Sequence, residues 1–154
     1  MNPIFKKLNL KEQKEIFVLN SPESFENNIL ELDTGLKVKH NVSQSDTIEF
    51  YIGFAEMQSD LRKMIEGSAS QLEGDALYWL CYPKKSSKKF KSDITRDDGW
   101  EAIAQYNMEP VKLVSIDEDW SAMRFRKVEY IKVLNRNKKM IISKEGMEKA
   151  KKSK

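Results

Sequence analysis

Four short apolar runs, separated by segments with helical periodicity, constrain the fold of this chain more than any other feature. They lie at residues 15–19, 47–54, 76–82 and 110–116. Mostly apolar runs of this length are typical of strands that are covered on both faces. Alternating strands and helices are typical of βαβ units joined into a parallel sheet. We therefore predict an α/β fold, a single three-layer Rossmann-like domain with a mostly parallel sheet.

Turn and capping residues divide the apolar runs from the predicted helices. Ser21 suits an N-cap and Pro22 the first helical position, and Gly35 ends the helix that they begin. Residues 36–40 alternate between apolar and polar side chains, which predicts a short edge strand. A longer amphipathic helix follows over residues 57–72.

The second half of the predicted sheet depends on a helix start and a turn. Thr95-Arg96-Asp97-Asp98 resembles a capping box that begins a helix with Trp100 on its inner face. Residues 117–119 predict a turn, and residues 121–127 a strand that returns beside 110–116. This last pair is expected to form an antiparallel hairpin at one edge of the sheet.

Length and charge predict one domain with a basic addition. The chain has 154 residues, enough for one ordinary domain, which we place at residues 1–130. Residues 131–154 are then a basic C-terminal extension, because twelve lysines or arginines but only three glutamates lie between 124 and 154. The extension is either a solvated terminus or a contact for nucleic acid or another acidic partner.

Composition favours a cytoplasmic protein with no membrane partner. The single cysteine, Cys81, cannot form an internal disulfide, and the charged N-terminal segment contains no signal peptide. The longest apolar stretch, 76–82, is much shorter than the ~20 residues that a membrane helix needs.

The motifs of common cofactor and metal sites are missing from the sequence. The turn after the first apolar run, 20–23, contains no glycine, so we predict no nucleotide or adenosylmethionine cofactor. His40 is the only histidine and is expected on an edge strand, and Cys81 is expected to be inert packing. We predict no metal and assign no catalytic residue.

Two loops expected at the same edge of the sheet hold the candidate ligand-binding residues. Ligands of doubly wound sheets bind beyond the carboxyl ends of the strands, where the loop after 76–82 and the turn after 110–116 would lie together. The candidates are Lys84, Lys85, Asp93, Thr95, Arg96, Asp117, Trp120, Ser121 and Arg124.

These residues admit a functional and a structural interpretation. The lysines and a helix N-terminus favour an anion, while Trp120 and Arg124 would add a stacking surface and a forked donor. In the structural interpretation the lysine loop is solvated, Trp100 and Trp120 are core residues, and Arg96 pairs with a nearby aspartate. The clusters Asp97-Asp98 and 117–119 are then capping and turn residues.

Parts of this region resemble a widespread bacterial family of small uncharacterised α/β proteins, a domain of unknown function. The resemblance covers roughly residues 16–126 and rests on Tyr82-Pro83-Lys84-Lys85, Asp93-Ile94-Thr95-Arg96-Asp97 with Gly99-Trp100, and Ile116-Asp117…Trp120-Ser121-Ala122…Arg124-Phe125. It implies the fold and carries over no activity.

A looser resemblance is to the second half of adenosylmethionine-dependent methyltransferases. The strand at 47–54, the helix at 57–72, the strand at 76–82 and the closing hairpin follow the same order. The glycine-rich cofactor turn of those enzymes is missing here. The resemblance therefore implies a chain with a related sheet and without the cofactor.

Three hypotheses about function follow. The first is a non-enzymatic binding or interaction module that uses the basic rim at the carboxyl ends of the strands. The second is an enzyme that acts on an anionic small molecule, with Asp93, Asp97 or Asp117 as acid or base and Arg96 or Arg124 as an electrostatic clamp. The third is non-specific nucleic-acid binding through the basic extension.

Overall fold

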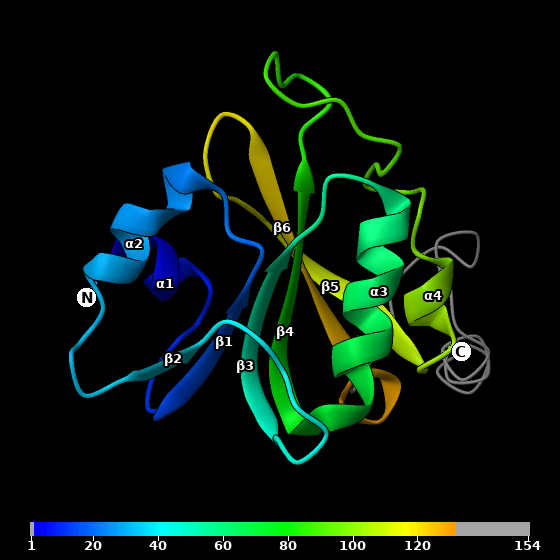
Figure 1. Ribbon diagram of the computed structural model, residues 1–154. Coiled ribbons are helices and arrows are strands. Elements are labelled where there is room, and N and C mark those ends of the chain that lie inside the picture. Colours follow the sequence, from blue (N-terminus) through cyan, green and yellow to red (C-terminus); the bar gives the residue numbers. More distant parts are fainter. Residues whose placement is uncertain (1, 132–154) are drawn as a thin grey trace.

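A six-stranded mixed sheet organises residues 2–131, the part of the chain that the computed structural model describes (Figure 1). Its strand order is β2-β1-β3-β4-β6-β5. The strands are β1 (Glu15–Leu19), β2 (Lys37–Lys39), β3 (Ile48–Phe54), β4 (Leu72–Pro83), β5 (Met108–Ser115) and β6 (Trp120–Lys127). The three pairings among β2, β1, β3 and β4 are parallel, whereas β6 is antiparallel to both β4 and β5.

The predicted three-layer domain with a mostly parallel sheet is wrong in its second half, although the antiparallel pair of β5 and β6 does lie at one edge of the sheet. The run at 110–116 does not pair with β4. Instead β6 lies between β4 and β5, so the sheet is a mixture of parallel and antiparallel pairings. The physical reason is burial. Trp120, Ala122 and Phe125 of β6 are almost completely buried, while β5 exposes Leu113 and contains Pro110, which suits an edge because it has no N–H to donate.

The helices are shorter than the sequence predicts. They are α1 (Pro3–Lys7), α2 (Glu26–Leu30), α3 (Gln58–Ser68) and α4 (Glu101–Ala104), with 3₁₀ turns η1 (Glu23–Phe25), η2 (Ala69–Gln71) and η3 (Val128–Tyr130). The expected helix from Ser21 to Gly35 is reduced to η1 and α2. The expected helix behind Thr95 is reduced to α4, because residues 95–98 form a tight turn of their own.

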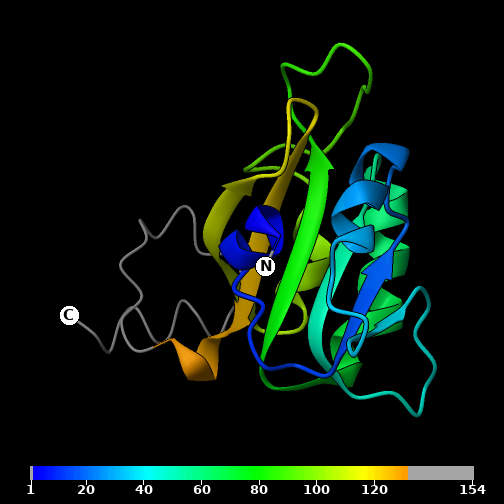
Figure 2. The same cartoon turned by 90° about the vertical axis from the view of Figure 1, so that its left-hand side faces the viewer.

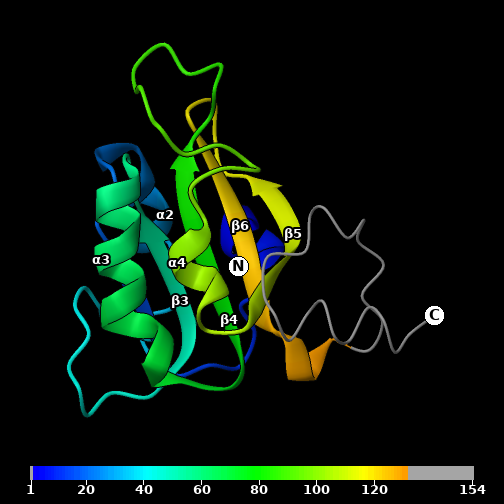
Figure 3. The same ribbon diagram turned by 90° about the vertical axis from the view of Figure 1, so that its right-hand side faces the viewer.

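The two faces of the sheet carry separate hydrophobic clusters. Figures 1 and 3 show α3 and α4 on one face, where α3 contributes Leu61 and Ile65 against Tyr51 and Tyr78 of the sheet. Figure 2 shows α1 on the opposite face. There the helical turns contribute Phe5, Leu8 and Phe25, which pack against β3 and β4.

One hydrogen bond ties the N-terminal segment to the centre of the sheet. The indole N–H of Trp79, in β4, donates to the carbonyl oxygen of Leu8 at 2.9 Å. Trp79 is completely buried, so this bond satisfies a polar group that would otherwise be buried without a partner. The segment before β1 is therefore an integral part of the fold.

Between residues 2 and 131, no helix combines the length and apolar character that crossing a membrane requires. The basic extension predicted at 131–154 lies outside the described residues except for Ile131. The sequence also predicts a short strand at 131–134 and a basic helix at 144–152. Apart from Ile131, both lie outside the described residues.

Candidate functional site

The loop that follows β4 is joined to the turn between β5 and β6 at the carboxyl edge of the parallel strands (Figure 2). The backbone N–H of Lys84 donates to the carbonyl oxygen of Asp119 at 2.7 Å. The Lys84 ammonium donates to Ser115 Oγ at 2.6 Å, and Ser87 Oγ donates to Asp119 Oδ1 at 2.7 Å. The structure thus brings together the two loops that the sequence placed on one rim.

Asp117 shapes the turn rather than facing an open site. Its Oδ1 accepts hydrogen bonds from the backbone N–H groups of Asp119, at 2.8 Å, and Trp120, at 2.9 Å. Its Oδ2 accepts a bond from Ser24 Oγ at 3.4 Å. Such Asx-type bonds are the ordinary way in which aspartate stabilises a turn.

Trp120 belongs to the hydrophobic core. Its side chain is only 2 % exposed, and its ring lies against Phe54 and Phe90 at centroid distances of 5.2 and 5.1 Å. Within the described residues, its buried Nε1 has no hydrogen-bond partner. Phe90 is one of the residues that anchor the loop after β4 to the sheet.

Asp93 caps α3, the longest helix. Its Oδ1 accepts the backbone N–H of Gln58, the first residue of α3, at 2.7 Å. Its carbonyl oxygen accepts a bond from the Gln58 side-chain amide at 2.6 Å. A carboxylate of the protein therefore occupies the place at this helix N-terminus where an anionic ligand would bind.

Replacing Asp93 with alanine tests this capping role. We expect Asp93→Ala to lower the free energy of unfolding by about 1 kcal/mol, the usual cost of losing a side-chain cap. Asp97→Ala is the matched control, because Asp97 is exposed and its change should stay within about 0.5 kcal/mol. Urea unfolding of both variants measures the difference. Equal effects would contradict the capping role.

Thr95 organises the turn that leads to α4. Its Oγ1 accepts the backbone N–H groups of Asp97 and Asp98, at 3.3 and 3.0 Å, and donates to the Asp98 carboxylate at 3.1 Å. Its carbonyl oxygen accepts a bond from Trp100 Nε1 at 2.8 Å. The Trp100 ring packs between Tyr82 and Phe125 in the core.

The remaining predicted site residues do not converge on one point. Arg96 is exposed and lies 3.6 Å from the carboxylate of its neighbour Asp97. Ser121 is buried in β6 opposite Tyr82. Arg124 lies opposite Trp79, further from the rim, and approaches Asp75. The nine candidates are thus divided between a surface loop, turn and capping positions, and the interior of β6.

The lysine-rich loop, which we define as residues 84–91, remains open to solvent. Lys85, Lys88, Lys89 and Lys91 are exposed, and within residues 2–131 none of them forms an ion pair. Lys89 lies over the Phe90 ring at 5.7 Å. Lys84 and Lys85 are among the predicted ligand-binding residues, and the sequence also predicts that Lys88, Lys89 and Lys91 favour an anion together with them.

Cys81 is a free cysteine that lies buried in β4. Burial raises the pKa of the Cys81 thiol well above its ordinary value, so the reactive thiolate is disfavoured. No group of three or more histidine, cysteine or carboxylate side chains between residues 2 and 131 is arranged to hold a metal ion.

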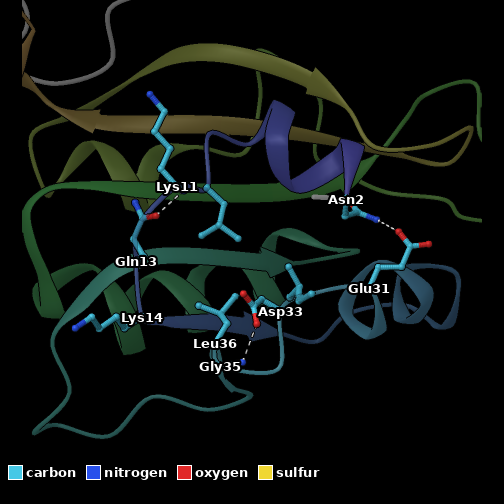
Figure 4. Close-up of a pocket in the computed structure, with 10 residues that line it drawn as sticks. Asn2, Lys11, Gln13, Lys14, Glu31, Asp33, Gly35 and Leu36 are labelled. Atoms are coloured by element: carbon cyan, nitrogen blue, oxygen red, sulfur yellow. Dashed lines mark hydrogen bonds between the residues drawn. The ribbon is translucent and has the colours of Figure 1, made fainter.

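A cleft that the sequence did not indicate lies beside the segments that lead into β1 and β2 (Figure 4). Its volume is about 590 Å³. Asn2 borders it with a side chain that caps α1 and donates to Asn28 and Glu31. The other lining residues are Leu10, Lys11, Gln13, Lys14, Glu31, Leu32, Asp33, Gly35 and Leu36. Figure 4 shows Lys11 and Lys14 extending away from the carboxylates of Glu31 and Asp33.

Comparison with known proteins yields distant structural similarity alone. No protein-family model and no curated protein sequence matches this chain. The resemblance to the uncharacterised bacterial family therefore stays a prediction. The chain is similar to a structure described as LepI in complex with SAM, with 11% identity, a TM-score of 0.49, and coverage of 81% of this chain and 46% of that one.

A second similar structure is a protein of the NADB-Rossmann superfamily from Streptococcus agalactiae. It matches with 8% identity and a TM-score of 0.45 over 82% of this chain and 68% of that one. With 46% coverage, this chain spans less than half the length of the first structure, that of LepI. Both TM-scores lie below 0.5, so neither match carries an argument about the family or a ligand of this chain.

Proposed function

We propose that this chain is a non-enzymatic interaction module whose lysine-rich loop docks onto an acidic segment of a partner protein. The observation that carries the proposal is the contrast between this loop and its surroundings. The predicted carboxylates Asp93 and Asp117 are used for capping and turn formation, whereas four exposed lysines of the loop have no anionic partner within residues 2–131.

The shape of the loop favours a macromolecular partner. Figures 1 and 2 show that the segment after β4 projects beyond the sheet, and its base is fixed by Lys84, Ser87 and Phe90. A projecting loop offers point charges to an extended surface and cannot enclose a small molecule. Because its base is fixed, the loop also loses less conformational entropy when it binds a partner.

The charges beside the loop favour an acidic protein over a nucleic acid. The loop is followed by Asp93, Asp97 and Asp98 and lies next to the turn at 117–119, so six carboxylates accompany its five lysines and Arg96. The rim is therefore neutral as a whole. The carboxylates repel a phosphate backbone, which carries one charge per ~1.7 Å of duplex, more strongly than an acidic peptide, which carries at most one charge per ~3.3 Å of extended chain.

Charge reversal on the loop tests the proposal. We expect Lys85→Glu, Lys88→Glu and Lys89→Glu together to weaken binding of fluorescent poly-L-glutamate at least 10-fold, because each reversal replaces an attraction by a repulsion. Fluorescence anisotropy at low and physiological salt measures it. The three residues are exposed, so the melting temperature should change little.

The matched control reverses three dispersed lysines, Lys7, Lys14 and Lys63, which are also exposed. It produces the same change in net charge without altering the loop, and it should retain most of the binding. Equal losses in the two triple variants would overturn the proposal, since net charge alone would explain them. Tighter binding to a DNA duplex than to poly-L-glutamate would overturn the choice of an acidic protein.

A further inference from the structure

Arg124 and Lys112 lie side by side on the sheet face that carries α1. In the register of the sheet, Arg124 of β6 is the direct partner of Trp79 on one side and of Lys112 on the other. Ala122 and Val114, two residues along each strand, belong to the hydrophobic cluster of that face. Because side chains two residues apart point the same way, Arg124 and Lys112 share this face. Directly opposed side chains have Cβ atoms about 4.5–5.5 Å apart.

Like charges placed directly opposite each other destabilise a sheet unless something neutralises them. One carboxylate is near: Arg124 Nη2 lies 3.7 Å from Asp75 Oδ1, without a hydrogen bond. Asp75 is already bound by Arg126, whose Nε and Nη2 donate to its two oxygens at 2.9 and 2.6 Å. Arg126 therefore neutralises most of the Asp75 charge, in the bidentate geometry that is strongest for such pairs.

The Arg124 guanidinium is held in a poorly solvated place. Its side chain is 15% exposed. Within residues 2–131, its buried Nε has no hydrogen-bond partner. Burial lowers the pKa of Arg124, an effect that nearby Asp75 opposes. Burying a cationic donor that has no hydrogen-bond acceptor costs free energy of folding, so the unpaired Nε of Arg124 needs an explanation.

Other charged groups around Arg124 and Lys112 do not fully neutralise the positive charge of the pair. Lys112 is exposed and forms no ion pair in the described part of the chain. Glu109 is buried in β5 opposite Arg126 and has interactions of its own. Glu109 and Asp75 together face three cations, Lys112, Arg124 and Arg126. One positive charge is therefore left over, and it lies at the pair formed by Arg124 and Lys112.

We infer that Arg124 and Lys112 form a binding site for the phosphate group of a small phosphorylated molecule. A phosphate group has acceptor oxygens for two adjacent cationic donors, one a planar forked donor and the other a flexible point charge. A phosphate group carries three acceptor oxygens and can bind both cations at once, whereas a carboxylate has only two oxygens in one plane. The site lies on the middle of β6 and β5, so it is distinct from the lysine-rich loop at the carboxyl edge, and it does not depend on the partner proposed above.

Phosphate titration of the full chain tests this site. We expect inorganic phosphate at constant ionic strength to raise the melting temperature progressively, because a ligand that binds only the folded state stabilises it. Acetate at the same ionic strength should have little effect. We expect Lys112→Gln to weaken phosphate binding about 10-fold or more in isothermal titration calorimetry. Lys112 is exposed, so this variant should fold normally.

Two further variants sharpen the outcome. Asp75→Asn removes the competing carboxylate and should tighten phosphate binding, whereas Arg62→Gln, on the exposed face of α3, should leave it unchanged. Phosphate binding that Lys112→Gln and Asp75→Asn both leave at the wild-type level would overturn the inference. No phosphate binding by the wild-type protein would overturn it as well.

Discussion

Trp120→Ala is expected to lower the free energy of unfolding by about 3–5 kcal/mol, the range for removing a large aromatic side chain from a core. Trp120 is 2% exposed and lies between Phe54 and Phe90, so alanine would leave a cavity and release the anchor of the lysine-rich loop. Chemical denaturation measures the change. A loss below about 1 kcal/mol would show that the indole is not a core residue, and would revive its role as a stacking surface for a ligand.

Replacing Trp120 or Trp79 with phenylalanine separates the contribution of packing to stability from that of hydrogen bonding. The Nε1 of Trp120 has no partner in the described residues, so Trp120→Phe loses only volume. Trp79→Phe loses volume and also the 2.9 Å hydrogen bond that Trp79 Nε1 donates to the Leu8 carbonyl. We therefore expect Trp79→Phe to be the more destabilising by about 1 kcal/mol. The reverse order would contradict the anchoring of the N-terminal segment to β4.

Gly53→Ala is expected to destabilise the protein by about 1–3 kcal/mol, because it overfills a packed core. A Cβ at this position of β3 would lie 2.8 Å from Tyr51 Cε1 and 3.0 Å from the Met64 side chain. Met64 is flexible and can move. The Tyr51 ring is completely buried against Tyr78, at a centroid distance of 5.0 Å, and cannot move freely.

The control for Gly53→Ala is the same substitution in α3. Gly67 is a helical glycine, and no atom lies within 4 Å of the position that a Cβ would occupy there. Gly67→Ala should therefore stabilise the protein by about 0.5–1 kcal/mol through helix propensity. The two alanine variants should thus shift the urea midpoint in opposite directions. A stabilising Gly53→Ala would show that β3 has free space beside Tyr51.

A pocket that held two of the candidate carboxylates would strengthen the hypothesis of an enzyme acting on an anionic small molecule. Asp93 instead caps α3, Asp117 holds the turn before β6, and Asp97 lies exposed beside Arg96. These roles give the hypothesis no support at the carboxyl rim. The hypothesis of nucleic-acid binding through the extension stays a prediction, because that segment lies outside the described residues.

Local patterns in the sequence were sufficient to locate the strands. Continuous apolar residues mark β1, β3 and most of β4, because a strand covered on both faces has no polar side to reveal. The turn at Asp117 was likewise predictable, since aspartate binds backbone N–H groups two and three residues ahead. The short helices were overestimated, because apolar spacing alone does not show where a capped turn replaces a helix.

The sequence by itself determined which segments are buried, since burial depends on the apolar character of each run, and it determined that lysines crowd the loop after β4. Only the tertiary structure decided that β6 enters the sheet between β4 and β5. The position of β6 beside β4 depends on whether β5 or β6 buries more surface there. This is a comparison between two segments, and no local pattern in the sequence contains it. The same choice places Arg124 beside Lys112 and divides the predicted rim site.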